Sequence, residues 1–231
     1  MIFVTGDTHR LLDVEKLNKE HFPIQDKLNK EDYLIIAGDF GAVWDGGPRD
    51  KEALDYHANK HYTTLFVAGN HENHVLLNSY PVEEWNGGKI HRIRDDVIHL
   101  MNGQVFEINN RKIFIMGGAT SIDKAYREAG KSWWEEEEPP FEVFEEGMEN
   151  LKKYNNEVDY IITHTCPEII RDDYMYKFEG YIDYESPVEK FLDVVLDNIR
   201  YKKWYLGHLH IDKEIPDFNM RILFDDIDRL L

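Results

Sequence analysis

Short apolar runs recur along the chain and predict β-strands. Within each run the apolar residues are nearly continuous rather than alternating with polar ones, as is typical of strands that are covered on both faces. Five of these runs are of special interest because polar residues follow each of them at once. They are Ile2–Val4, Tyr33–Ala37, Leu65–Ala68, Tyr160–Thr163 and Trp204–Leu206.

Two helices are predicted in the intervening sequence. Pro48–Lys60 has a proline near its start, where a helix does not need the missing amide proton. Ser186–Ile199 begins with a serine that can cap a helix, followed by a proline and then by a glutamate three residues after the serine. Its apolar residues recur at helical spacing, which predicts one buried face.

The middle of the chain predicts a meander of strands, and Met220–Phe224 predicts a late strand. Asn102-Gly103 and Asn109-Asn110 are candidate hairpin turns within the meander. An α/β fold with two stacked mixed β-sheets flanked by helices is expected, in a single domain over residues 1–231. The strands of the meander are expected at Lys89–Arg94, Val97–Met101, Gln104–Ile108 and Arg111–Met116.

Composition and charge narrow the classes of protein. The 231 residues, 42% of them hydrophobic, are enough for one sizeable core. The net charge of −18, with no cluster of lysine and arginine, argues against general binding to nucleic acid. No apolar run is long enough to span a membrane, and Cys166 has no second cysteine to pair with. The first residues lack the basic flank of a signal peptide, so a cytoplasmic location is expected.

Candidate chemistry lies directly after the five strands. Ligands of α/β sheets bind at the carboxyl ends of the strands, and glycine, which permits a tight turn, precedes the polar residue in four of the five blocks. The blocks are Gly6-Asp7-Thr8-His9, Gly38-Asp39, Gly69-Asn70-His71-Glu72, His164 and Gly207-His208-Leu209-His210.

These blocks supply two carboxylates, one amide oxygen and four imidazoles as possible metal ligands. A mixed set of oxygen and nitrogen ligands suits Mn, Fe, Zn, Co or Ni better than Mg or Ca. Seven ligands are too many for one tetrahedral ion, so two divalent transition-metal ions bridged by a carboxylate are expected, with Mn²⁺ as the first choice. If the substrate of so acidic a protein carried phosphate, it would need a local positive centre, and bound metal ions could supply one.

The ordered set Asp-x-His, Gly-Asp, Gly-Asn-His-Glu, His and Gly-His-x-His resembles the calcineurin-like metallophosphoesterase superfamily. The match runs from Asp7 to His210 and implies a fold of two mixed sheets between helices. It also implies hydrolysis of phosphate esters by a metal-activated hydroxide at a dinuclear site. In that family the first metal would be held by Asp7, His9 and His210, and the second by Asn70, His164 and His208.

The resemblance implies that Asp39 bridges the two metals. It further implies that His71 faces the substrate and protonates the leaving oxygen or stabilises the phosphoryl charge, and that Glu72 can orient His71.

The class of substrate is left as a choice between small phosphodiesters and small phosphomonoesters. Protein Ser/Thr phosphatases of the superfamily carry glycine after the first histidine and an Asp-Arg pair after the second block. Here Arg10 follows His9, and no arginine follows Asp39 closely, which disfavours that class but keeps it as an alternative. Another alternative is a non-catalytic protein-binding scaffold, although such members lose ligands or the catalytic histidine.

Two segments outside the blocks each have two interpretations. The loop 117–123 is either a strand-to-helix turn capped by Ser121 or a loop that reaches the site. In the second case Lys124 and Arg127 would contact the substrate phosphate. The tract Trp133–Pro140, with four consecutive glutamates, is either a solvated loop or a lid with its tryptophans turned inward, within a possible insert at 125–150.

Overall fold

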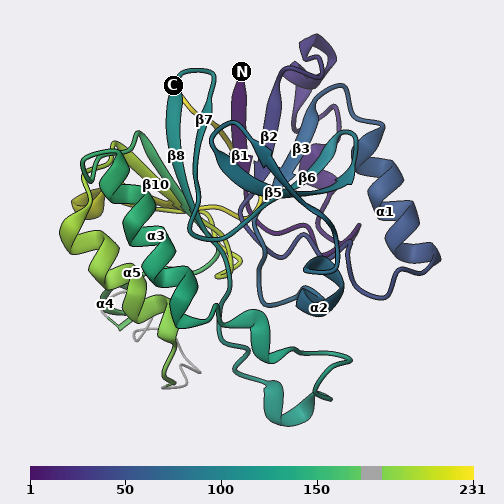
Figure 1. The fold of residues 1–231 in the computed structure, drawn as a ribbon. Coiled ribbons are helices and arrows are strands. Elements are labelled where there is room, and N and C mark those ends of the chain that lie inside the picture. The colour runs from purple at the N-terminus through teal and green to yellow at the C-terminus, as the bar shows by residue number, and fades with distance from the viewer. Residues whose placement is uncertain (173–183) are drawn as a thin grey trace.

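The computed structural model describes residues 1–172 and 184–231, and two mixed β-sheets lie at its centre with helices outside them (Figure 1). The predicted α/β fold with two stacked mixed sheets is therefore confirmed. The first sheet has seven strands, in the order β13 (Ile227–Arg229), β1 (Ile2–Thr5), β2 (Tyr33–Ile36), β3 (Thr63–Phe66), β6 (Val97–Leu100), β5 (Gly88–Arg94) and β4 (Val82–Trp85).

The second sheet has six strands, and four of them, like four in the first sheet, run parallel to their neighbours. Parallel strands place their carboxyl ends at one edge, so the residues that follow them gather there. The order is β11 (Lys213–Ile215), β12 (Met220–Ile222), β10 (Lys203–Leu206), β9 (Tyr160–Thr163), β8 (Arg111–Met116) and β7 (Val105–Ile108).

Helices cover the outer faces of both sheets. Helix α1 (Pro48–Ala58) packs on the first sheet, whereas α3 (Phe141–Lys153) and α5 (Pro187–Asn198) pack side by side on the second (Figure 1). Helices α2 (His74–Leu77) and α4 (Glu168–Ile170) are short. Single 3-10 turns lie at Glu15–Leu17, Pro23–Lys27, Lys124–Tyr126, Glu135–Glu137 and Pro216–Phe218. Among the described residues, no helix has both the length and the apolar character needed to cross a bilayer.

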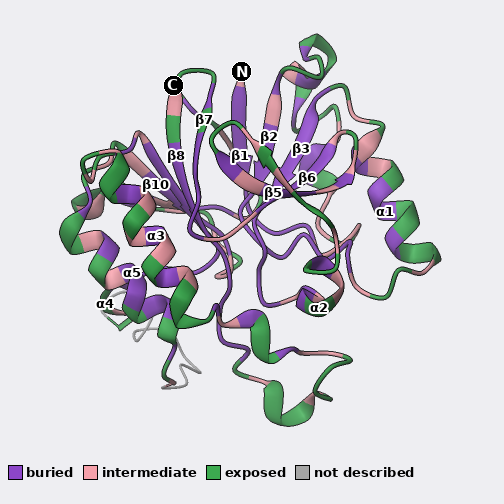
Figure 2. Ribbon diagram, viewed as in Figure 1, coloured by how far each residue is buried: buried purple, intermediate pink, exposed green. Residues whose placement is uncertain are grey.

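The core has several layers because successive strand residues point to opposite faces. Ile35 of β2 faces the second sheet, while Ile36 packs against helix α1. Ile162 of β9 faces the first sheet, while Ile161 packs under α3 and α5. Figure 2 shows the resulting pattern, with buried strands in the centre and exposed residues on the outer sides of the helices. This burial on both faces explains why the strands read as continuous apolar runs.

Most predicted elements are confirmed with small shifts. The third strand begins at Thr63 rather than at Leu65, because the pairing with β2 includes two β-branched threonines that precede the apolar run. The side chain of Ser186 caps α5 as expected, accepting the amide proton of Glu189. The Asn109-Asn110 hairpin is also confirmed, since both residues have left-handed φ values, 50° and 61°, and join β7 to β8.

The hairpin predicted at Asn102-Gly103 is wrong. Strand β6 before it belongs to the first sheet and β7 after it to the second, so this turn carries the chain between the sheets. Gly103 has a left-handed φ of 75°, as a tight turn requires, and its Cα lies against Gly147 of α3. A turn sequence determines a local bend, but the partner of each strand is decided by where its apolar face is buried.

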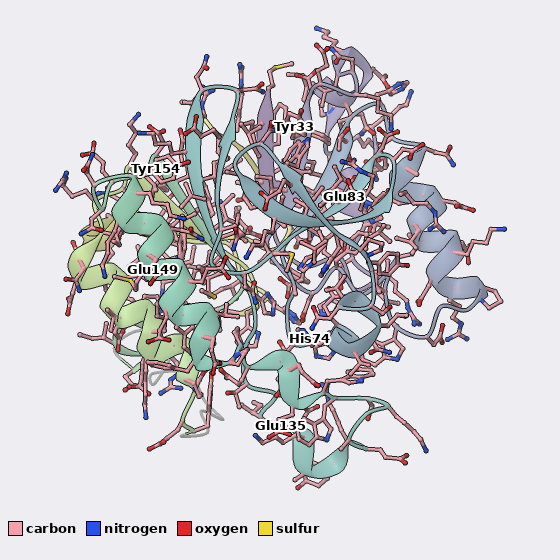
Figure 3. The ribbon with its side chains drawn as sticks, viewed as in Figure 1. Tyr33, His74, Glu83, Glu135, Glu149 and Tyr154 are labelled. Carbon is pink, nitrogen blue, oxygen red and sulfur yellow. The ribbon has the colours of Figure 1, made fainter. Side chains whose placement is uncertain are left out.

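Helix α3 was not predicted from the sequence, where an insert at 125–150 was considered instead. Residues from Phe141 onward are helical, and Phe144 and Leu151 are buried in the core beside α5. A lid can therefore comprise only residues that precede Phe141. These residues form an excursion at the end of the molecule below α2 (Figure 1), and we call residues 123–138 the Trp/Glu segment. It contacts α2 close to Glu135, near His74 (Figure 3).

Candidate metal centre

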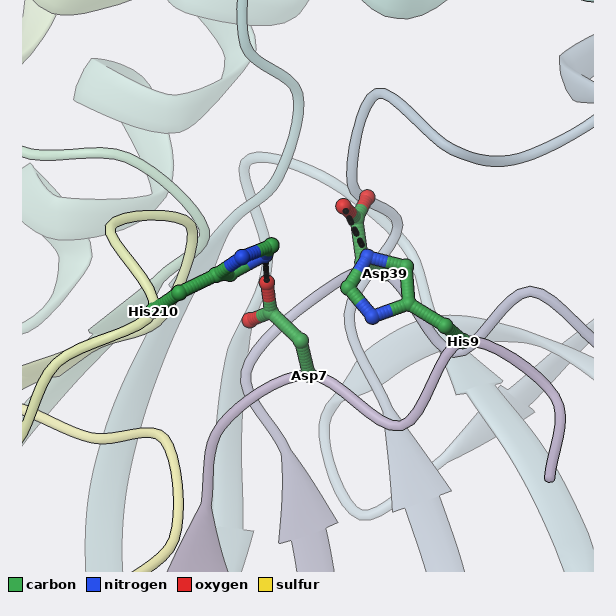
Figure 4. A group of neighbouring side chains, drawn as sticks. All are labelled: Asp7, His9, Asp39 and His210. Atoms are coloured by element: carbon green, nitrogen blue, oxygen red, sulfur yellow. Dashed lines mark hydrogen bonds and ion pairs between the residues drawn. The ribbon is translucent and has the colours of Figure 1, made fainter. Parts of the chain in front are cut away.

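The residues that follow five parallel strands meet at one edge of the two sheets. Asp7 and His9 follow β1, and Asp39 follows β2. His210 comes from the other sheet, after β10, yet its ring lies beside the Asp7 carboxylate (Figure 4). The ligand atoms of Asp7, His9, Asp39 and His210 all lie within 4.8 Å of one another, and together they form a group that could hold a metal ion.

Asp39 faces two sets of side chains with its two oxygens. Its Oδ2 lies 3.2 Å from Nε2 of His9, a pair that Figure 4 marks with a dashed line. Its Oδ1 lies 3.2 Å from Nε2 of His164, which in turn lies 3.1 Å from Oδ1 of Asn70. The ring of His208 packs 4.8 Å from that of His164. All seven residues expected as ligands are thus brought together, with Asp39 between two groups.

Hydrogen bonds fix the proton positions of two of these histidines. Nδ1 of His164 lies 3.0 Å from the carbonyl oxygen of Ala37, which can only accept, so Nδ1 carries a proton. Nε2 of neutral His164 then directs a lone pair at two oxygens, those of Asp39 and Asn70. In the same way Nδ1 of His9 lies 2.7 Å from Oδ2 of Asp13, which leaves its Nε2 facing Asp39.

Acceptor atoms that face one another require a cation or a proton between them. Oδ2 of Asp7 is also buried without a hydrogen bond, although it lies 3.1 Å from Nε2 of His210. A carboxylate buried without a partner costs several kcal/mol unless positive charge compensates it. The donor set and its tautomers therefore fit divalent metal ions. Histidine ligands of metals commonly donate their other ring proton to a carboxylate or carbonyl, as His9 and His164 do here.

The electrostatics of the metal-free side chains lead to the same conclusion. Burial by itself lowers the pKa of His164, but the carboxylate of Asp39 outweighs burial and raises that pKa to about 9. Burial also opposes the rise for His9, whose pKa Asp39 again brings to about 9. His208 differs: burial and the neighbouring His164 lower its pKa to about 3. The two carboxylates thus favour positive charge on the side chains between them.

The glycines before the ligands make room for the ligand of a neighbouring block. A Cβ atom on Gly69 would lie 2.0 Å from Oδ1 of Asp39, and one on Gly207 would lie 2.3 Å from Oδ1 of Asp7. These two glycines are therefore required by packing, since neither has the left-handed φ that favours glycine. Asp39 itself has a left-handed φ of 46°, a strained conformation for a residue with a side chain.

His71 lies beside this cluster. Its backbone amide donates to Oδ1 of Asp39 over 2.8 Å, and its ring packs edge-on at 5.4 Å from that of His9. Nε2 of His71 lies 3.1 Å from a terminal guanidinium nitrogen of Arg127. Burial and the charge of Arg127, partly offset by Asp39, lower the pKa of His71.

Glu72 contacts the second block rather than His71. Its Oε1 accepts the amide proton of Gly41 over 3.0 Å, and its other oxygen is buried without a hydrogen bond. Burial raises the pKa of this carboxyl to about 8. The carboxyl of Glu72 therefore contacts the loop that carries Asp39, whereas His71 contacts Asp39 and Arg127.

The loop 117–123 reaches the site, which was one of its two interpretations. Oγ of Ser121 accepts a hydrogen bond from Nδ2 of Asn70 over 3.1 Å. Of the two basic residues beyond it, Arg127 reaches His71, whereas Lys124 is exposed and lies 5.7 Å from the centre of the Trp133 ring. Within the described residues Lys124 has no contact with the ligand cluster.

The Trp/Glu segment is not simply a solvated loop. Trp134 is buried, and its ring packs edge-on at 4.9 Å from that of Trp44. Glu137 is buried as well and accepts two hydrogen bonds from Ser121. The inward tryptophan agrees with the alternative of a lid. Neither Glu137 nor Asp13 was assigned from the sequence, because residues 9–13 form a turn rather than a helix and Glu137 meets Ser121 only through packing.

The family model described as calcineurin-like phosphoesterase matches residues 1–212. Among solved structures, a phosphopantetheinyl hydrolase from Mycobacterium tuberculosis matches with a TM-score of 0.45 and 16% identity, over 96% of this chain and 86% of that one. A putative 5'-nucleotidase from Staphylococcus aureus has the same TM-score and identity, but the match spans only 47% of its length.

The calcineurin-like phosphoesterase YfkN from Bacillus subtilis matches with a TM-score of 0.41 and 14% identity, over 97% of this chain and 81% of that one. No curated protein sequence matches the chain.

Proposed function

The chain belongs to the calcineurin-like phosphoesterase family, and from that premise we propose that it hydrolyses small phosphodiesters or phosphomonoesters at a dinuclear metal centre. The observation that carries the proposal is the position of Asp39. Its two oxygens face two separate groups of ligands, as a bridging carboxylate requires. In this proposal Asp7, His9 and His210 hold one ion, and Asn70, His164 and His208 hold the other.

Two bound divalent ions would supply positive charge for the phosphoryl group and acidify a water molecule at neutral pH. Mn²⁺ is the first expectation for their identity, with Fe, Zn, Co and Ni as the other candidates. The protein itself must hold the ligand side chains in position. It does so through hydrogen bonds to His9 and His164 and through the glycines that let the blocks approach.

His71 is the proposed proton donor to the leaving oxygen. In the structure its Nε2 accepts from Arg127, so the ring is neutral before the substrate binds. An anionic phosphate beside Arg127 would attract the guanidinium and free Nε2. It would also favour the protonated ring, because a nearby negative charge raises the pKa of a histidine. Proton donation by a positioned histidine is typically worth roughly 100- to 10,000-fold in rate.

Arg127 is the proposed contact for the phosphoryl oxygens, and Glu72 is proposed to act by holding the loop of Asp39. A guanidinium suits oxyanions because its donors form a planar fork. The position of Arg127, beside His71, gives this chain a phosphate contact from the Trp/Glu segment. Protein Ser/Thr phosphatases would place an arginine near the second block, where this sequence has none.

The proposal is tested by measuring hydrolysis of a chromogenic monoester and a chromogenic diester side by side, with Mn²⁺ and each of the other candidate metals. The ratio of the two rates identifies the preferred ester. Wild-type protein that contains two ions and hydrolyses neither ester would refute the proposed enzymatic function and favour the alternative of a non-catalytic scaffold. Asp39→Ala should contain fewer ions by elemental analysis, and two retained ions would refute the bridging role.

A further inference from the structure

Glu137, in the Trp/Glu segment, is linked to the metal centre by an unbroken chain of hydrogen bonds. Both of its carboxylate oxygens accept from the same residue: Oε1 from the amide of Ser121 over 2.8 Å, and Oε2 from the hydroxyl of Ser121 over 2.7 Å. The same hydroxyl oxygen accepts from Nδ2 of Asn70 over 3.1 Å. Beyond the amide, Oδ1 of Asn70 faces Nε2 of His164.

The chain of bonds has a direction, because a hydroxyl group has a single proton. A carboxylate can only accept, so the proton of Ser121 must point to Glu137. The hydroxyl oxygen can then only accept from Asn70, so the NH₂ group of Asn70 must be the donor. As a result the amide oxygen of Asn70, rather than its nitrogen, faces the position where a metal would bind. Only the oxygen can be a ligand.

The three side chains are enclosed, so water cannot easily replace any one of them. Ser121 and Glu137 are each 2% exposed, and Asn70 is 4% exposed. We propose that Glu137 is a positioning residue for the second metal ion, acting through Ser121 to keep Oδ1 of Asn70 turned toward that ion. This inference rests on the proposed function, in which Asn70 is a metal ligand.

The adjacent residue, Glu138, offers a matched control. Its Oε1 accepts from the hydroxyls of Thr120 and Ser186, and its Oε2 accepts the amide proton of Val188 over 3.0 Å. These bonds tie the same segment to the start of α5. They have no link to Asn70, so loss of Glu138 measures the effect of loosening the segment without reversing the direction of the hydrogen bonds.

The test uses Glu137→Gln, which keeps the shape of the side chain. One carboxylate oxygen becomes an NH₂ group, so one of the two donors of Ser121 must lose its acceptor. If the NH₂ faces the hydroxyl, the hydroxyl proton is free to turn to Asn70 and the amide can flip. Support of this kind around a metal ligand is typically worth about 10- to 100-fold in metal affinity.

The measurement is a titration of the metal-free proteins with Mn²⁺, followed by calorimetry and by elemental analysis of the bound ions. We expect Glu137→Gln to lower the affinity for the second ion about 10- to 100-fold and the affinity for the first ion by less than about 3-fold. Glu138→Gln should leave both affinities within about 3-fold of wild type, since it does not touch the metal ligands. Ser121→Ala should resemble Glu137→Gln, and it is the second variant if the glutamine variant folds poorly by thermal unfolding.

A reversal experiment separates direction from simple packing. With Asn70→Asp an oxygen faces the metal whichever way the group turns, and the hydroxyl of Ser121 can donate to the other oxygen. Glu137→Gln should therefore lower the affinity for the second ion in the protein that has Asn70, but not in the Asn70→Asp protein.

Equal losses in both backgrounds, or equal losses in Glu137→Gln and Glu138→Gln, would overturn the positioning role while leaving the proposed function intact. Wild-type protein that binds fewer than two ions would overturn both.

Discussion

Replacing Asp39 by asparagine in the metal-free protein should change how its stability depends on pH. Asp39 is buried between His9 and His164, and it raises the pKa of each to about 9 from an ordinary value of 6.5. A histidine whose pKa is higher in the folded chain stabilises the fold fully below pH 6.5. That contribution is lost as the pH rises toward 9.

The magnitude follows from the difference between the two pKa values. For His164, which is fully buried, a pKa of about 9 in place of 6.5 corresponds to about 3 kcal/mol of stability that disappears between pH 6.5 and 9. Metal-free wild type should therefore become less stable as the pH rises through this range. Asp39→Asn keeps the shape but removes the charge, so most of this slope should be absent.

The assay is urea unfolding of both proteins in excess chelator, at several pH values from 6.5 to 9. Glu72, whose pKa is raised to about 8 by burial with a smaller contribution from Asp39, also lowers the stability as the pH rises through this range, and removal of the Asp39 charge should weaken that trend as well. Equal pH slopes for the two proteins would refute the reasoning. With Mn²⁺ the trend in wild type should reverse, because histidine ligands must lose their protons to bind a metal.

Three further predictions concern single side chains. His71→Ala should retain both ions and lose roughly 100- to 10,000-fold in kcat on an ester with a poor leaving group; an unchanged kcat would remove His71 as the acid. Arg127→Met should lower kcat/KM about 10-fold or more, through loss of a charged hydrogen bond, and should move the pKa of His71 upward in the pH–rate profile. The control is Lys131→Met, which changes an exposed residue of the same segment. An unmoved pH–rate profile in Arg127→Met would contradict the contact between Arg127 and His71. His57→Leu should raise the free energy of unfolding by about 1–3 kcal/mol, because both ring nitrogens are buried without partners. Burial lowers the pKa of His57 to about 3, so the folded chain is destabilised relative to the unfolded chain as the pH falls below 6.5. The gain from leucine should therefore be larger at pH 5 than at pH 7.5 in urea unfolding, and equal gains would show that burial does not lower the pKa of this ring.

The sequence by itself determined the type of fold and the members of the cluster of proposed metal ligands. Strands buried on both faces need continuous apolar runs, and parallel strands need their functional residues at one end, so both features are local in the sequence. For that reason Asp39, Asn70 and His164 could be singled out although they lie far apart in the chain. Helix α3 could also have been recognised, since Phe144, Met148 and Leu151 recur at helical spacing.

Tertiary structure alone decided which residues support the cluster. The bond from Glu137 through Ser121 to Asn70 joins residues 16 and 51 positions apart, and Arg127 reaches His71 across 56 positions. No periodicity connects such pairs, because they depend on how a loop packs after both sheets have formed. The same reason explains the error at Asn102-Gly103. The sequence predicted the turn correctly, but tertiary packing placed β7 in the second sheet rather than beside β6. The five blocks thus specify the proposed ligands, whereas packing of the Trp/Glu segment decides which residues hold them in place.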